Sequence, residues 1–159
     1  KIKNKSSISC LNKLANNLCN IAILPFPSKK NDWWIKLTNY SNISVVGSLC
    51  DSVSGDIEAL VLSTQKIEYA SNNISLYTSK ITSKNLKKYS DFLTCNGFII
   101  ICKKLLTSKS YIILFYTKIY SELENKGKLR IIDSYKFDDN IQTRLVGVFS
   151  SIDKEIING

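Results

Sequence analysis

One stretch near the end of the chain decides its fold: DDNIQTRLVGVFSSI, residues 138–152. Its apolar residues recur at steps of four, three, one and three, which is the spacing of a single helix face. The residues on this face are Ile141, Leu145, Val148, Phe149 and Ile152. An acidic residue, Asp138 or Asp139, precedes them and can cap the helix. The stretch therefore predicts an amphipathic helix that packs on the rest of the protein.

The segments just before this predicted helix have the composition of strands joined by tight turns. Residues 98–106 and 111–123 are rich in β-branched and aromatic side chains. Asn125-Lys126-Gly127 is a turn signal that leads into a third strand over residues 128–136. Consecutive apolar residues such as Ile99-Ile100-Ile101 indicate that both faces of these strands are covered.

The first half of the chain mixes helical and extended patterns. Ser7 can cap a helix over residues 8–18, and the two prolines, Pro25 and Pro27, then end it. Residues 33–37, 43–46 and 74–81 are predicted as strands, and Trp33 and Trp34 as core anchors. Residues 56–68 carry apolar side chains at helical spacing and predict a second helix.

These elements predict an α+β fold. Tight turns between neighbouring strands favour an antiparallel sheet, and helices packed on it give an αβα sandwich. We expect residues 1–24 to form a basic N-terminal arm and helix, and residues 25–159 to form a single α+β domain. The alternative is a calycin-like β-barrel, which requires residues 141–149 to be a strand.

Histidine is absent from all 159 residues, and this removes several classes of enzyme. Histidine is the usual general base near neutral pH, so Ser-His-Asp and Cys-His nucleophile systems are excluded. The usual zinc and non-haem iron sites are excluded too. The adjacent Asp138 and Asp139 suit a helix cap better than an acid/base pair. We therefore expect a non-catalytic binding or docking domain without a metal or cofactor.

The net charge of +9 comes from twenty lysines and only two arginines, Arg130 and Arg144. A basic surface attracts acidic partners, and salt weakens this attraction. Nucleic-acid readers instead use arginine forks and basic stripes interleaved with aromatic residues, and the sequence has neither pattern. The composition thus favours an acidic protein surface as partner, with no role for nucleic acid.

The cysteines and the apolar runs of the sequence do not identify the cellular compartment of the protein. The five cysteines have no metal-ligand spacing, and either one disulfide with spare thiols or five thiols fits the odd number. The longest notable apolar runs, residues 98–102 and 111–116, are shorter than a membrane span, so we expect a peripheral protein. Lys1 in place of methionine suggests processing or truncation, either of which could have removed a targeting peptide.

The predicted order of elements resembles the PsbP family of thylakoid-lumen proteins over residues 23–152. LPFPS at residues 24–28 resembles the family's early Pro-Ser segment, and SNISVV at residues 41–46 resembles its Asn-Val-Ser-Val strand. NKGKL at residues 125–129 resembles its Asn-Gly-Lys-Leu-Tyr turn. The chain departs from the family where Ile99-Ile100 replaces a pair of tyrosines.

This resemblance implies an extrinsic subunit or assembly factor of a photosynthetic membrane complex of the photosystem II type. The expected location is the plastid thylakoid lumen, with the plastid stroma or secretion as alternatives. Family members dock by electrostatic attraction, so exposed lysines would contact an acidic surface of the membrane complex. The lysines predicted to supply this docking charge are Lys29, Lys30, Lys84, Lys87, Lys88, Lys103 and Lys104.

The barrel alternative rests on two shorter resemblances. Residues 129–134 and 149–151 resemble the end of S-type bilin lyases, and residues 33–38 resemble a strand of plastid fibrillins. Either would imply a chromophore- or lipid-binding protein, with Arg130 and Asp133 as candidate pigment contacts. A surface or interaction module of a parasite or virus is a third interpretation, based on composition alone.

Overall fold

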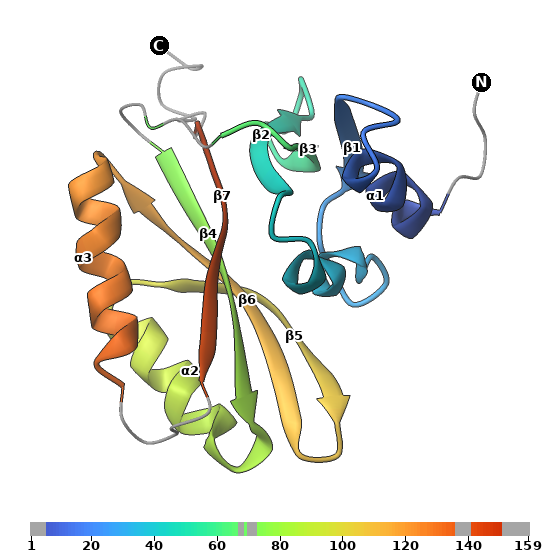
Figure 1. Ribbon diagram of the computed structural model, residues 1–159. Coiled ribbons are helices and arrows are strands. Elements are labelled where there is room, and N and C mark those ends of the chain that lie inside the picture. The colour runs from blue at the N-terminus through green and yellow to red at the C-terminus, as the bar shows by residue number, and fades with distance from the viewer. Residues whose placement is uncertain (1–5, 67–68, 70–72, 136–140, 151–159) are drawn as a thin grey trace.

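A computed structural model of the protein describes residues 6–66, 69, 73–135 and 141–150 (Figure 1). The basic arm at residues 1–5, the predicted cap Asp138 or Asp139, and Ile152 lie outside the described residues. The elements in chain order are α1 (Ser7–Ala15), β1 (Ile21–Pro25), the 3-10 helix η1 (Trp33–Asn39), β2 (Ser44–Cys50), β3 (Ile57–Ser63), β4 (Asn73–Thr82), the 3-10 helix η2 (Ser83–Asn85), α2 (Leu86–Cys95), β5 (Ile99–Thr107), β6 (Ser110–Ile119), α3 (Glu122–Asp133) and β7 (Gln142–Ser150).

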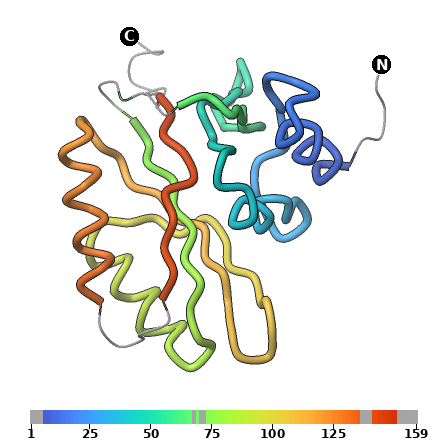
Figure 2. The backbone as a smooth tube through the Cα atoms, viewed as in Figure 1, coloured from blue at the N-terminus to red at the C-terminus, as the bar shows by residue number. Residues whose placement is uncertain are grey.

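The strands form one mixed, curled sheet with the order β1-β3-β2-β7-β4-β6-β5. Neighbouring strands are antiparallel except β2 and β7, which are parallel and share one registered pair, Val45 with Gly147. The backbone trace in Figure 2 shows residues 6–66 beside residues 73–150, with β7 next to the first half of the chain. The architecture is therefore a half-barrel made mostly of strands.

The αβα sandwich expected from the sequence is wrong, because residues 142–150 form the central strand β7 and not a closing helix. Val146 is an extra residue in β7, since Leu145 pairs with Tyr77 while Gly147 pairs with the next residue back, Leu76. This bulge interrupts the alternation of a strand and produces the helix-like spacing of apolar residues. The barrel-like alternative, which required a strand here, is compatible with the curled sheet.

Gly147 permits a close approach of β7 to β2. A Cβ atom at this position would lie 2.5 Å from the Cβ of Val45 and 2.6 Å from its carbonyl oxygen. Real Cβ atoms do not come this close to backbone, so β2 and β7 can pair here only because residue 147 is glycine. The same glycine disfavours the helix that the apolar spacing predicted.

The elements β4, α2, β5, β6, α3 and β7 form a β-α-β-β-α-β unit, the split arrangement with strand order β7-β4-β6-β5. Helices α2 and α3 cover one face of these strands (Figure 1), which we call the helix face. Tyr77 lies at its centre, stacks on Phe115 with 5.5 Å between ring centroids, and donates a hydrogen bond to Asn125 of α3. Burial raises the pKa of Tyr77 to about 12, so its hydroxyl stays protonated at neutral pH.

The opposite face of β4, β6 and β7, which we call the inner face, packs against the first half of the chain. Trp33 and Trp34 are buried in this larger core, which confirms their prediction as anchors. The indole Nε1 of Trp33 donates to the carbonyl oxygen of Pro25 at 2.7 Å and so ties η1 to the end of β1. The two cores lie on opposite sides of the same strands, so both faces of β4 and β6 are covered.

Some of the remaining helices and strands predicted from the sequence are confirmed by the structure, and others are wrong. The helix over residues 8–18 is confirmed as α1, although Ser6 and not Ser7 caps it by accepting from the Ser9 amide at 3.2 Å. The strands at 43–46, 74–81 and 98–106 are confirmed as β2, β4 and β5, and the strand at 111–123 is confirmed as β6 up to Ile119, whereas residues 122–123 begin helix α3. Three predictions are wrong: residues 33–37 form the 3-10 helix η1, the predicted helix at 56–68 contains strand β3, and the predicted strand at 128–136 contains the end of helix α3. Among the described helices, none has the length and apolar character needed to cross a membrane.

Candidate functional site

Two hollows lie along the inner face, one lined by polar and one by apolar side chains. Both use β4 and β7, but at opposite ends of the strand pair. Thr78 and Lys80 of β4 line the polar hollow, whereas Ile74 and Leu76 of the same strand line the apolar one. Alternate residues of a strand point to one face, so a single strand face supplies both linings.

The polar pocket has a volume of about 210 Å³ and lies between β4, the start of β7 and the end of η1. Strand register places Lys80 opposite Gln142 and Thr78 opposite Arg144. The lining contains two cations and hydrogen-bonding side chains, and it contains no carboxylate, cysteine or histidine. Its residues are Thr38, Thr78, Lys80, Gln142, Thr143 and Arg144.

Arg144 connects this pocket to the loop after η1. Its guanidinium donates hydrogen bonds to the carbonyl oxygens of Leu37, Tyr40 and Ile43, the last two at 2.8 Å and 3.1 Å. Burial lowers the pKa of Arg144 by desolvation. Arg144 forms no ion pair with a carboxylate within the described part of the chain.

Two of the three threonines of the pocket are held by neighbouring oxygens. The hydroxyl of Thr38 donates to the carbonyl oxygen of Ile35 at 2.9 Å, and the hydroxyl of Thr143 lies 2.8 Å from that of Ser79. Ser79 in turn bonds the buried Tyr89 of α2 at 2.8 Å. The polar pocket is therefore fixed on one side by η1 and on the other by a hydrogen-bonded chain that reaches the helix face.

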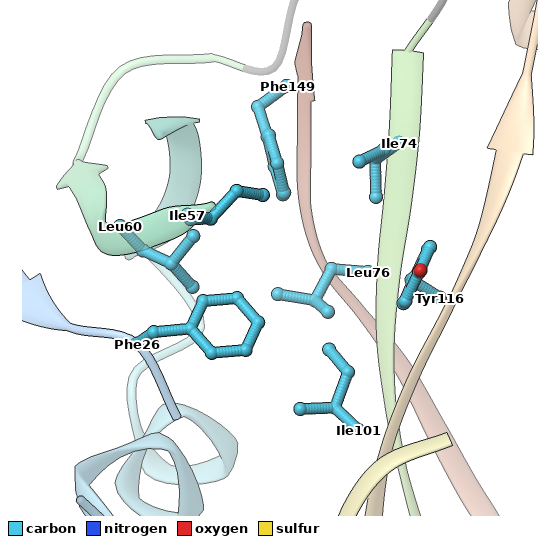
Figure 3. A pocket seen from close by; sticks show the side chains of 8 residues that line it. All are labelled: Phe26, Ile57, Leu60, Ile74, Leu76, Ile101, Tyr116 and Phe149. Carbon is cyan, nitrogen blue, oxygen red and sulfur yellow. The ribbon is translucent and has the colours of Figure 1, made fainter. Parts of the chain in front are cut away.

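The apolar pocket lies at the other end of the inner face and encloses about 80 Å³. Figure 3 shows side chains of the first half of the chain, Phe26, Ile57 and Leu60, facing those of β4, β5, β6 and β7. The full lining is Phe26, Ile57, Leu60, Ile74, Leu76, Ile101, Tyr116 and Phe149. All are hydrophobic, so the pocket suits an apolar group.

An open groove of about 580 Å³ adjoins this pocket and shares Phe26 and Ile101 with it. Lys29 and Lys103 are exposed and line the groove, so a positive rim lies beside an apolar interior. Burial raises the pKa of Cys102, another lining residue, to about 11, which keeps it a neutral thiol at neutral pH. All five cysteines of the chain are free thiols in the structure.

The lysines predicted for docking fall into two groups. Lys29, Lys30 and Lys103 are exposed near the groove, where Lys104 pairs with Asp32 at 2.6 Å between Nζ and Oδ2. The other three are exposed on η2 and the first turn of α2, and these are Lys84, Lys87 and Lys88.

Sequence reasoning missed both hollows. The candidate pigment contacts Arg130 and Asp133 lie exposed on α3 and line neither hollow. Arg144 and Lys80 were not singled out, because their proximity depends on the pairing of β4 with β7. The rarity of arginine was an available signal, since Arg144 is one of two in a chain rich in lysine.

Comparisons with known proteins show similarity in fold alone. No protein-family model matches the chain, and no curated protein matches it. A prephenate dehydratase from Streptococcus mutans aligns over 92% of this chain and 82% of its own, with a TM-score of 0.59 and 14% sequence identity. GqqA, described as a novel type of quorum-quenching acylase, aligns over 94% of this chain and 81% of its own, with a TM-score of 0.67 and 13% identity.

Proposed function

We propose that this protein is a non-catalytic binding domain for a small organic oxyanion, a carboxylate or phosphate, that enters the polar pocket. The observation that carries this proposal is Arg144, a half-buried guanidinium that has no carboxylate partner among the described residues. Removing a cation from water costs free energy unless an anion or well-placed acceptors offset that cost. The three carbonyl oxygens supply part of the offset, and a bound oxyanion would supply the rest.

The chemistry of the lining fits such a ligand. A guanidinium carries five N–H donors, so three hydrogen bonds to carbonyl oxygens leave donors for a ligand oxygen. Lys80 adds a second positive charge, and Thr78 adds a hydroxyl group, whereas the hydroxyl of Thr38 already donates to the carbonyl oxygen of Ile35. A water molecule needs about 10–15 Å³ of such volume. The pocket of about 210 Å³ therefore admits an organic anion of several non-hydrogen atoms.

The residues that line the polar pocket favour binding without catalysis. The six lining residues include no histidine, carboxylate or cysteine, so the most common general bases and the thiol nucleophile are missing from the lining. One solved structure of similar fold is named a prephenate dehydratase, and prephenate is a dicarboxylate. Prephenate is thus a suitable probe, although an identity of 14% supports no transfer of activity.

We expect calorimetric titration of the chain with prephenate or inorganic phosphate to show saturable binding that sodium chloride at equal ionic strength does not show. Lys80→Gln should weaken that binding about tenfold, because a charge-assisted hydrogen bond is lost from a partly desolvated site. Lys36→Gln is the matched control, since Lys36 is exposed on η1 and does not line the pocket. Equal affinities for the two variants, or no saturable heat with either anion, would contradict the proposal.

We propose, as a second function, that the protein docks on an acidic partner, as the sequence predicted. It is supported by the three exposed lysines that follow one another on η2 and α2, Lys84, Lys87 and Lys88. Three like charges on one short segment create a local positive field that attracts an acidic surface. Whether that partner is a photosynthetic membrane complex, in the thylakoid lumen or elsewhere, stays a prediction from the sequence resemblance.

Charge reversal at these three lysines tests the docking proposal. Replacing all three by glutamate should abolish sedimentation of the chain with isolated thylakoid membranes at low salt, and 0.5 M salt should release the wild type, as a screened interaction requires. Reversal of Lys36, Lys109 and Lys118, which are also exposed, changes the net charge equally and should reduce binding much less. Equal losses in the two triple variants would show that only total charge matters.

A further inference from the structure

We infer that the apolar pocket and the adjoining groove form a second site, independent of the polar pocket, that binds an anionic amphiphile such as a medium-chain fatty acid. The apolar pocket and the groove share Phe26 and Ile101, so a ligand can extend from one into the other. Its apolar end would occupy the enclosed part, and its charged head would lie in the groove.

The enclosed volume limits the size of the apolar end. It measures about 80 Å³, about half of the roughly 150 Å³ of an apolar cavity that holds benzene. A narrow alkyl end therefore fits without movement of the lining, whereas an aromatic ring does not. The open groove of about 580 Å³ accommodates the remainder of the chain.

The charge at the rim selects the head group. Lys29 and Lys103 line the groove and are exposed, and neither forms an ion pair within the described residues. Lys104 cannot serve in the same way, because Asp32 already pairs with it. Two unpaired cations beside an all-hydrophobic pocket favour a carboxylate head over a neutral one, since a neutral alcohol gains only the burial of its chain.

Octanoate and octanol, titrated into the full chain by calorimetry, separate the two contributions. We expect saturable binding of octanoate, and weaker binding of octanol. The double variant Lys29→Gln/Lys103→Gln should weaken octanoate about tenfold and leave octanol unchanged, since exposed ion pairs each contribute about 1 kcal/mol at most. Lys118→Gln is the control, because Lys118 is exposed on β6 and lines neither hollow.

A blocking variant tests the apolar half of the site. Ile101→Trp adds bulk at the residue shared by pocket and groove, and it should abolish binding of both octanoate and octanol. If this variant does not fold, the lysine variants still decide the question. Octanoate without saturable heat, or equal octanoate affinity in the double variant and Lys118→Gln, would overturn the inference. Phosphate or prephenate binding at Arg144 uses no residue of this site, so the two proposals fail separately.

Discussion

Gly147→Ala is expected to lower the free energy of unfolding by about 3 kcal/mol, a large fraction of the stability of a domain of this size. The added methyl group would lie 2.5 Å from the Cβ and 2.6 Å from the carbonyl oxygen of Val45, and backbone atoms cannot rotate away as the end of a long side chain can. Relief requires β2 and β7 to separate where they pair, at Val45 and Gly147. Urea unfolding followed by circular dichroism measures the loss.

Gly127→Ala is the matched control for this substitution. Gly127 lies within α3, and nothing would lie within 4 Å of an added Cβ atom there. Alanine is the better helix former, so this variant should gain about 0.5–1 kcal/mol. The proposed close approach of β2 to β7 would be refuted if the two alanine variants unfolded at the same urea concentration.

Arg144→Met is expected to lower the free energy of unfolding by about 2–3 kcal/mol and to abolish oxyanion binding in the polar pocket. Methionine keeps an unbranched apolar stem, but the carbonyl oxygens of Leu37, Tyr40 and Ile43 lose their charged donor. Loss of these bonds releases the loop after η1 from β7. Hydrogen exchange of the amides in residues 37–43 would show faster opening of this loop in the variant.

The second arginine of the chain supplies the control. Arg130 is exposed on α3, so Arg130→Met makes the same chemical change without removing a buried donor, and stability should change by less than about 0.5 kcal/mol. It should also leave the affinity for prephenate and phosphate unchanged. An Arg144→Met variant that kept wild-type stability and affinity would remove Arg144 from both roles.

Strands were predictable where β-branched and aromatic residues dominate, and unpredictable where the spacing of apolar residues also fits a helix. β4 and β6 were recognised from their β-branched and aromatic residues. β3 pairs with β1 on one side and β2 on the other, and its residues 57–63 are apolar at irregular steps that match a helix equally well. Periodicity alone does not distinguish a short buried strand from a helix, which explains the errors at β3 and β7.

The sequence contained a signal for the start of helix α3, but the turn predicted at residues 125–127 obscured it. Ser121 accepts a hydrogen bond from the Glu124 amide at 3.1 Å, and the Glu124 carboxylate accepts one from the Tyr120 amide at 2.9 Å. This is close to a capping box, whose sequence pattern is a serine followed three residues later by glutamate. Gly127 suggested a hairpin, yet it lies inside the helix with open space around it.

The candidate sites were less accessible to sequence reasoning than the fold. Arg144 bonds to a loop more than 100 residues earlier in the chain, and no local pattern connects these positions. The apolar pocket takes its lining from the segment after β1 and from five strands, so it exists only after the sheet has curled. Residue types were informative about chemistry, and the topology alone determined which of them meet.

The place of β7 has a consequence for biosynthesis. This strand holds the last described residues of the chain, yet it lies between β2 and β4 in the middle of the sheet. Until residues 142–150 leave the ribosome, β2 and β4 lack the strand that lies between them. The backbone groups that β2 and β4 present to β7 stay unpaired during this time. The sheet therefore cannot close before residues 142–150 have been made, and premature termination before Gln142 should yield an aggregation-prone product, not a smaller stable protein.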